Sequence, residues 1–159
     1  MISEGRILSI FRTKGGPGGS TSTADELSQY AKEFLEKDLK GHQALIARVE
    51  SKDNWFAVSK SELVSGFKGH VRHTNLTDIM GVVSTPTQLL EVKRSGGPLE
   101  LRLAGDSTLT LWLDGGRPFV GVLNVFNYIV KTTHGRRSGQ GLVPTRKSGS
   151  IRETQESGM

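Results

Sequence analysis

The sequence predicts an α+β domain with a mainly antiparallel sheet, an amphipathic helix near its N-terminus, and disordered basic termini. An apolar stripe at helical spacing follows residue 23, and strand-like segments with alternating apolar residues fill the stretch 99–131. Stretches rich in Gly, Ser and Thr lie at both ends. We therefore divide the chain into a basic Gly-rich segment 1–22, a globular domain 23–131 and a flexible basic tail 132–159.

The first apolar segment, Arg6 to Arg12, predicts a short strand, because β-branched, aromatic and other apolar residues are concentrated in it. Four glycines and a proline follow between Lys14 and Ser20. These residues end regular structure and predict a loop.

The amphipathic helix is predicted over residues 24–40. Thr23 and Glu26 have the spacing of a capping box, in which each side chain satisfies a backbone amide of the other residue. Lys40 and Gly41 suit the C-terminal end, since they supply a cation and a left-handed cap. One face is apolar because its residues recur at steps of three and four: Leu27, Tyr30, Ala31, Phe34, Leu35 and Leu39.

Shorter elements follow this helix. The sequence predicts strands at 43–50 and 55–59, and one half-buried strand over 63–73. It predicts helices over 75–83 and from Thr85 to Gly96, where a proline occupies the first turn of the second helix.

The last part of the domain predicts a three-stranded antiparallel meander over 99–103, 109–113 and 119–131, with Gly- and Asp-containing turns between the strands. Both faces of the third strand are apolar, so both require cover. The sequence leaves open whether the domain's own helices or a partner subunit provide it.

Charge is distributed unevenly along the chain, which has a formal net charge of +5. Residues 23–131 hold 13 Lys+Arg and 13 Asp+Glu, whereas residues 1–22 have a surplus of 2 positive charges and residues 132–159 a surplus of 3. A neutral body with basic ends predicts contact with a polyanion. The candidate residues for binding phosphates of RNA or of an acidic membrane are Arg136, Arg137, Arg146, Lys147, Arg152, Arg6, Arg12 and Lys14.

Several functional classes find no support. The chain has no cysteine, which excludes disulfides and zinc sites built on thiolates. His70 and His73 are three residues apart, so on a strand they point to opposite faces, and we expect no metal site. No Gly-x-Ser-x-Gly motif and no paired acid and base occur. We expect no enzymatic activity, no catalytic residue, no cofactor and no small-molecule substrate.

One local resemblance concerns the Gly-rich loop at 14–21. It is similar to the phosphate loop of ParA/MinD-type ATPases, with Lys14, the glycines and the hydroxyls of Ser20 and Thr21 in register. Gly19 stands where that family has its central phosphate-binding lysine. The resemblance implies a degenerate nucleotide-binding protein, and a flexible linker before the helix is the alternative.

A second resemblance is to the matrix proteins of negative-strand RNA viruses, in particular those of the rhabdovirus and bornavirus group. The stretch Val122 to Tyr128 is similar to a strand near the C-terminus of bornavirus matrix proteins, and the basic stretch Gly135 to Arg146 follows it. The resemblance implies a non-enzymatic structural protein that self-associates and bridges viral nucleoprotein and RNA to an anionic membrane. It implies a virion and host-cytoplasm location with peripheral membrane contact. A small nucleic-acid-binding accessory protein is a further alternative.

The N-terminus has no long apolar stretch of the kind that signal peptides contain, and no segment has the ~20 apolar residues that a membrane-spanning helix needs. We therefore expect a protein of the cytosol or of a particle assembled from it.

Overall fold

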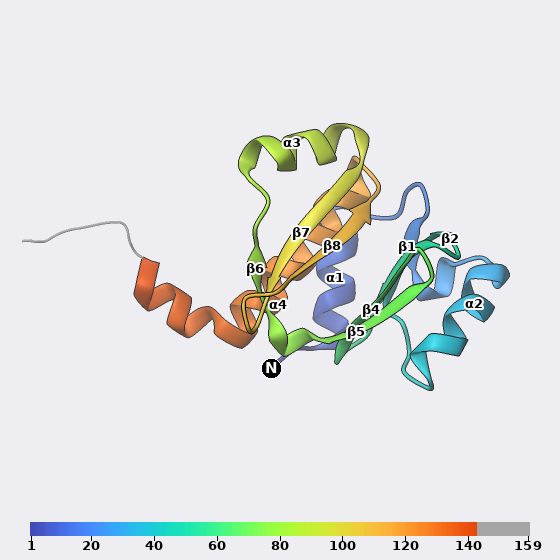
Figure 1. Cartoon of the computed structure of the whole chain (residues 1–159), viewed down its shortest axis with the longest axis horizontal. Coiled ribbons are helices and arrows are strands. Elements are labelled where there is room, and N and C mark those ends of the chain that lie inside the picture. Colours follow the sequence, from blue (N-terminus) through green and yellow to red (C-terminus); the bar gives the residue numbers. More distant parts are fainter. Residues whose placement is uncertain (143–159) are drawn as a thin grey trace, which may run out of the picture.

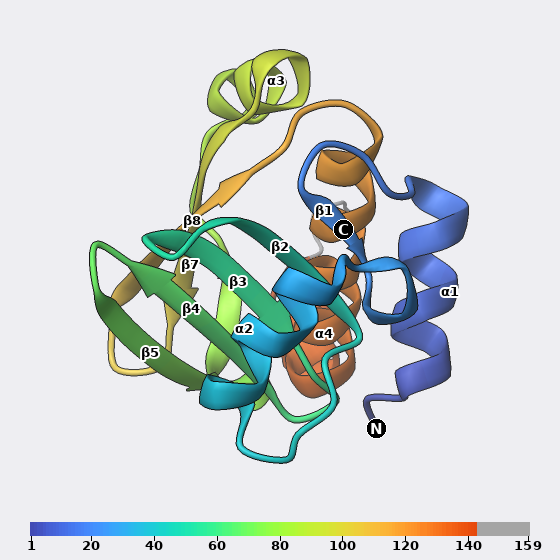
Figure 2. The same cartoon turned by 90° about the vertical axis from the view of Figure 1, so that its right-hand side faces the viewer.

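Two antiparallel sheets and four α-helices make up the part of the chain that the computed structural model describes, residues 1–142, with side chains described as far as residue 135 (Figures 1 and 2). The predicted α+β class with mainly antiparallel sheets is confirmed. The helices are α1 (Glu4–Lys14), α2 (Gln29–Leu39), α3 (Pro86–Ser95) and α4 (Arg117–Leu142), and short 3₁₀ turns cover Ala24–Glu26 and Leu76–Asp78.

The first sheet has five strands in the order β1-β2-β3-β4-β5, and the second has three in the order β6-β7-β8. Every neighbouring pair is antiparallel. Turns of two to four residues join β2 to β3, β3 to β4, β4 to β5 and β7 to β8, whereas α2 lies between β1 and β2 and α3 between β6 and β7. The strands of the first sheet are β1 (Thr21–Thr23), β2 (Ile46–Ser51), β3 (Asn54–Val58), β4 (Glu62–Phe67) and β5 (His70–Asn75), and those of the second are β6 (Ile79–Val82), β7 (Gly97–Leu103) and β8 (Thr108–Leu113).

Helix α2 covers one face of the first sheet (Figure 2). Its N-cap is Ser28, whose hydroxyl accepts a hydrogen bond from the Ala31 amide at 3.1 Å. The predicted capping box at Thr23 is wrong: the Thr23 hydroxyl donates to Asp25 at 2.6 Å, and a 3₁₀ turn separates this residue from α2. Leu35 and Leu39 of the predicted apolar stripe pack with Trp55 of β3 beneath the helix.

The predicted first strand at 6–12 is wrong, because these residues form helix α1. The Ser3 hydroxyl caps the helix by accepting from the Arg6 amide at 3.2 Å. Ile7 and Phe11 are four residues apart and fully buried, so they share one helix face against α4. The N-terminal segment 1–22 is thus part of the folded body and is not a loose arm.

The predicted strand 119–131 is also wrong, because it lies within α4. The side chains that this helix buries recur at three- and four-residue steps: Phe119, Val122, Val125, Phe126 and Ile129. The other apolar residues of this stretch flank the stripe and are partly buried by the same core. Helix α1 and the second sheet of the same chain therefore cover this apolar stretch (Figure 1). The sequence had left open whether a partner subunit covers it.

The segment 63–73 forms two strands rather than the predicted one. Phe67 pairs with His70, so Lys68 and Gly69 alone make the turn. Both have positive φ, 51° and 85°, as a type I′ hairpin turn requires. Lysine is unusual in this position, and the turn was therefore missed in the sequence.

The segment 75–83 is a 3₁₀ turn followed by strand β6, so the predicted helix there is wrong beyond its first turn. The helix predicted from Thr85 and the strands 99–103 and 109–113 are confirmed as α3, β7 and β8. Thr85 and Gln88 form a complete capping box at the start of α3.

Candidate functional site

The Gly-rich loop between α1 and β1 packs against the N-terminal end of α4. A side chain at Gly15 would overlap the Arg117 carbonyl and the backbone of Gly121, and one at Gly18 would lie 2.8 Å from the ring of Pro118. The Arg117 Nε donates to the Gly15 carbonyl at 3.0 Å. The glycines are therefore needed for close packing of the loop on α4.

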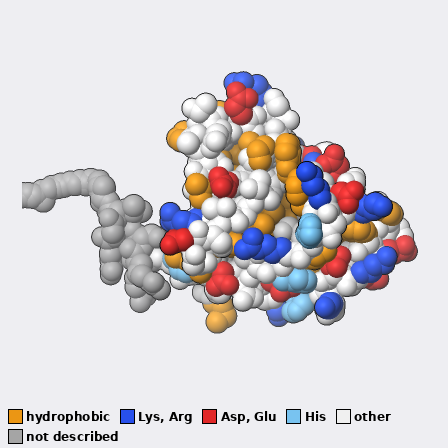
Figure 3. Space-filling model, viewed as in Figure 1, with side chains coloured by type: hydrophobic (Ala, Val, Ile, Leu, Met, Phe, Trp, Pro, Cys, Tyr) orange, Lys and Arg blue, Asp and Glu red, His pale blue; other side chains and the backbone are white. Residues whose placement is uncertain are grey.

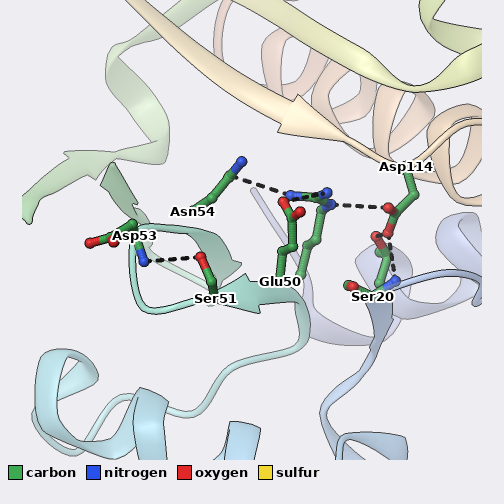
Figure 4. A network of polar contacts seen from close by, with 8 residues as sticks. Ser20, Glu50, Ser51, Asp53, Asn54 and Asp114 are labelled. Atoms are coloured by element: carbon green, nitrogen blue, oxygen red, sulfur yellow. Dashed lines mark hydrogen bonds and ion pairs between the residues drawn. The ribbon is translucent and has the colours of Figure 1, made fainter. Parts of the chain in front are cut away.

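Asp114, at the end of β8, accepts two hydrogen bonds from the same loop. The Ser20 amide lies 2.8 Å and the Thr21 hydroxyl 2.7 Å from Asp114 Oδ2 (Figure 4). These donors belong to the motif that resembles a phosphate loop, and here they hold a carboxylate of the chain itself. The order is also helix–loop–strand, whereas phosphate loops lie between a strand and a helix. The geometry does not favour nucleotide binding at 14–21.

Arg48 of β2 is buried beside Asp114, with its side chain 8% exposed. Its Nε lies 3.2 Å from Asp114 Oδ1, an ion pair whose N–H direction is outside hydrogen-bond geometry. Its two terminal nitrogens donate to Asn54 Oδ1 at 3.3 Å and to Glu50 Oε1 at 3.1 Å (Figure 4). The guanidinium thus has acidic or polar partners on three sides, and its charge is balanced within the chain.

A groove lies next to this cluster, between the first sheet and β8. We call it the inter-sheet groove. It consists of two adjoining cavities of about 440 and 310 Å³ that share Asn54, Phe67 and Trp112 in their linings. The larger cavity is bounded by Arg48 and Asp114. Figure 3 shows hydrophobic side chains gathered around β8 on this face of the molecule.

Two aromatic side chains in the groove are unusually exposed. Phe67 is 48% and Trp112 is 41% exposed, although large aromatic rings favour burial. Trp112 follows Thr108 and Thr110 on the outward face of β8, whereas Leu109, Leu111 and Leu113 point into the core. These exposed rings are a typical feature of a contact surface.

The end of the groove near β5 is basic. His70 and Arg72 line the smaller cavity, and no acidic side chain does. Arg72 reaches the Thr108 carbonyl at 3.4 Å, and among the described residues it has no ion pair. Lys68 lies nearby, with its Nζ 5.3 Å from the centre of the Phe67 ring. This end of the groove is therefore suited to a negatively charged group.

Three of the predicted phosphate-binding residues have described side chains, and all three lie on α1. Arg6, Arg12 and Lys14 are exposed on α1. Arg6 and Arg12 are six residues apart, which places them on different sides of the helix. Arg136 and Arg137 lie in α4, and Arg146, Lys147 and Arg152 lie outside the described residues.

Among the predicted phosphate-binding residues, Arg12 has an ionic partner within the part of the chain that the structure describes. Its guanidinium lies 3.7 Å from Asp25 Oδ1, and both side chains are more than half exposed. The pKa of Asp25 lies below its ordinary value of 3.8, mainly because the Thr23 hydroxyl donates a hydrogen bond to the carboxylate, with a smaller contribution from Arg12. An exposed pair of this kind leaves Arg12 accessible to other anions.

His70 and His73 lie on β5, opposite Phe67 and Val64 of β4. Their odd spacing places them on opposite faces of the sheet, as predicted. The His73 Nδ1 lies 3.0 Å from Glu62 Oε1. In the part of the chain that the structure describes, no three His, Asp or Glu side chains are grouped as metal ligands would be.

No protein-family model, curated protein or solved structure matches this chain. The resemblance to viral matrix proteins was based on a strand at Val122 to Tyr128, and these residues are helical here. None of the helices within residues 1–142 is both long enough and apolar enough to span a bilayer.

Sequence reasoning missed the inter-sheet groove and the Arg48–Asp114 pair. Two signals were present. Trp112 occupies an outward position in a strand whose other outward residues are threonines, and Arg48 interrupts the apolar run that begins at Ala44. Neither signal indicates which distant strand lies opposite, so the sequence could mark the residues but not assemble the site.

Proposed function

We propose that the chain is a non-enzymatic assembly protein, of the kind that viral matrix proteins exemplify, which contacts phosphate groups through the distal part of α4. The observation that carries this proposal is the continuation of α4 beyond the body (Figure 1). Among the residues of α4 whose side chains are described, Ile129 is the last that is fully buried, and the helix extends to Leu142 and includes Arg136 and Arg137.

Helical geometry supports a role for these cations. At ~1.5 Å per residue, Lys131 and Arg137 are separated by about 9 Å along the axis, and these two positions lie on different sides of the helix, so they would contact separate phosphate groups. Lys131 is exposed. A helix that carries cations away from a neutral body contacts phosphates without reading bases, and its binding is therefore sensitive to salt and insensitive to sequence.

Helix α1 carries further exposed cations. Arg6 and Lys14 are exposed, and within the described part of the chain Arg12 has the exposed ionic partner Asp25. Since α1 packs directly on α4, the basic residues of both helices belong to one unit. Several weak contacts per molecule become strong when many molecules assemble on the same polyanion. This supports bridging of ribonucleoprotein and an acidic membrane, through self-association, as the proposed role.

The decisive experiment measures binding of the full chain to a single-stranded RNA of mixed sequence and to vesicles containing phosphatidylserine. The test variant is Arg136→Gln/Arg137→Gln, and the matched control is Lys93→Gln/Arg94→Gln on α3, which removes the same charge at exposed positions. We expect at least tenfold weaker binding for the test variant and less than a twofold change for the control.

The salt dependence separates phosphate contact from other effects. Loss of two contacts to single-stranded RNA should reduce the slope of log K against log salt by about 1.4. Bridging requires an effect in both arms, so an effect in the RNA arm alone or in the vesicle arm alone would support phosphate contact through α4 but contradict bridging. Equal losses for the test and control variants, or no loss in either arm, would contradict the proposal.

A further inference from the structure

We infer that the inter-sheet groove binds an extended peptide segment of a partner protein, one with an apolar and an acidic residue on the same face, laid along the free edge of β8. This inference is independent of the proposed contact between α4 and phosphate groups, since it concerns a different face. It begins with the backbone of β8.

β8 is an edge strand, paired on one side with β7. The Leu103 amide donates to the Ser107 carbonyl at 2.8 Å, which fixes the alternation of the ladder. The pairs Leu101–Leu109, Leu99–Leu111 and Gly97–Leu113 are then the hydrogen-bonded ones.

The remaining pairs turn their backbone groups away from each other. Pro98 pairs with Trp112 and has no amide hydrogen, and the Glu100 carbonyl accepts from the Val83 amide on the far side of β7. The N–H and C=O groups of Thr108, Thr110 and Trp112 therefore point away from β7.

One of these groups already has a partner within the chain. The Thr108 carbonyl accepts from Arg72. Outside the ladder with β7, the described hydrogen bonds include none from the backbone of Thr110 or Trp112. Two residues of strand edge are thus open between Arg72 at one end and Asp114 at the other, which is the arrangement to which an added strand binds.

The side chains around this edge determine the chemistry of the occupant. The exposed rings of Trp112 and Phe67 bound both cavities and offer an apolar anchor site next to the open backbone. Because side chains alternate along a strand, an anchored side chain is followed two residues later by another on the same face. His70 and Arg72 line the smaller cavity, which has no acidic side chain in its lining, and Arg72 reaches the carbonyl of Thr108, four residues before Trp112 on β8. An acidic residue in the peptide complements them.

The test uses the full chain as bait for a phage-displayed library of random seven-residue peptides, followed by affinity measurements on the selected peptides as synthetic molecules. We expect selected sequences in which a large apolar residue lies two or four positions from Asp or Glu, on the same face of the added strand. N-methylation of backbone amides on the side that faces β8 should weaken binding at least tenfold, because it removes the donors of an added strand.

Variants of the protein provide the second readout. Trp112→Thr continues the outward pattern of β8, and Phe67→Ser alters the opposite wall, so each should weaken binding at least tenfold. Arg72→Glu should change the selected acidic position to Lys or Arg. The control is Leu90→Ser, which removes an exposed apolar side chain on α3, away from the groove, and it should leave affinity unchanged.

The inference is overturned if the selection enriches no peptide, or if the selected peptides bind Trp112→Thr and Phe67→Ser as tightly as the original chain. It is also overturned if a synthetic peptide of residues 143–159 displaces the selected peptides, because the chain's own C-terminus would then be the occupant. A concentration-dependent dimer that Trp112→Thr abolishes would overturn it as well, because a second copy of the chain would be the occupant.

Discussion

Arg48 of β2 and Asp114 at the end of β8 form an ion pair, 3.2 Å apart, that joins the two sheets. Both side chains are shielded from solvent, at 8% and 18% exposure. Asp114 also holds the Gly-rich loop through Ser20 and Thr21. One carboxylate therefore positions three separate segments around the inter-sheet groove.

Removing this carboxylate should destabilise the fold strongly. Asp114→Ala leaves the Arg48 guanidinium without its solvent-shielded charged partner and leaves the Ser20 amide without its acceptor, and we expect a loss of about 3–5 kcal/mol in the free energy of unfolding. Urea denaturation measures this loss. The matched control is Glu50→Ala, which removes a half-exposed carboxylate from the same guanidinium and should cost ~1 kcal/mol or less. Similar losses for both variants would show that the pair is not effectively buried.

The Gly-rich loop should tolerate no side chain at Gly15. A Cβ there would meet the Arg117 carbonyl and the backbone of Gly121, so α4 must shift, and Gly15→Ala should cost about 1–3 kcal/mol or more. Gly5→Ala is the control within α1, since its nearest neighbour lies 3.8 Å away, and it should be neutral or stabilising by up to ~1 kcal/mol. Thermal unfolding followed by circular dichroism compares the two. An unaffected Gly15→Ala would mean that the loop does not pack on α4 as described.

The capping box of α3 provides a third test. The Thr85 hydroxyl accepts from the Gln88 amide at 3.2 Å, and the Gln88 side chain accepts from the Thr85 amide at 2.7 Å. Thr85→Ala should therefore lower stability by about 1 kcal/mol. Thr87→Ala makes the same change in an exposed position inside the helix and should have no cost, because alanine favours helix more than threonine does. Equal costs at the two positions would contradict the cap.

Asp25 should show the pH dependence of a carboxyl group whose pKa is lowered on folding. Its contribution to stability is fully present above its ordinary value of 3.8 and disappears as the pH falls through the lower folded value. Asp25→Asn should therefore differ from the original chain in stability at pH 6, and this difference should shrink as the pH is lowered below 4.

The cause of this shift can be tested by NMR titration of the Asp25 carboxyl. Thr23→Val removes the largest contribution and should raise the pKa of Asp25 toward its ordinary value, whereas Arg12→Ala should raise it less. The opposite order would assign the shift to the ion pair instead of the hydrogen bond.

Local sequence patterns correctly predicted the elements whose structure depends mainly on residues that are close together in the chain. Leu35 and Leu39 recur at helical spacing, and α2 buries them as predicted. The alternation of Leu109 and Leu111 with threonines likewise gave β8 and its buried face. In α2 the buried residues fit a helical repeat and do not fit the alternation of a strand, and in β8 they fit the alternation and do not fit a helical repeat.

Where the local pattern is ambiguous, the prediction was wrong. The stretch Phe119 to Lys131 is apolar on both faces of a strand, and it also carries a stripe at three- and four-residue steps. Its β-branched and aromatic residues favoured the strand by propensity. The tertiary structure selected the helix, in which this stripe packs into one core with α1 and the second sheet and Gly121 allows close contact with Phe11.

The sequence by itself determined the α+β class, the neutral charge of the central part and the basic ends, since each depends on composition or on residues that are close together in the chain. The tertiary structure alone decided that segment 6–12 is a helix packed on α4, and that Arg48 meets Asp114. It alone placed Phe67 and Trp112 across one groove. The physical reason is that these contacts join residues tens of positions apart, and the energy of such contacts depends on a packing geometry that no local pattern contains.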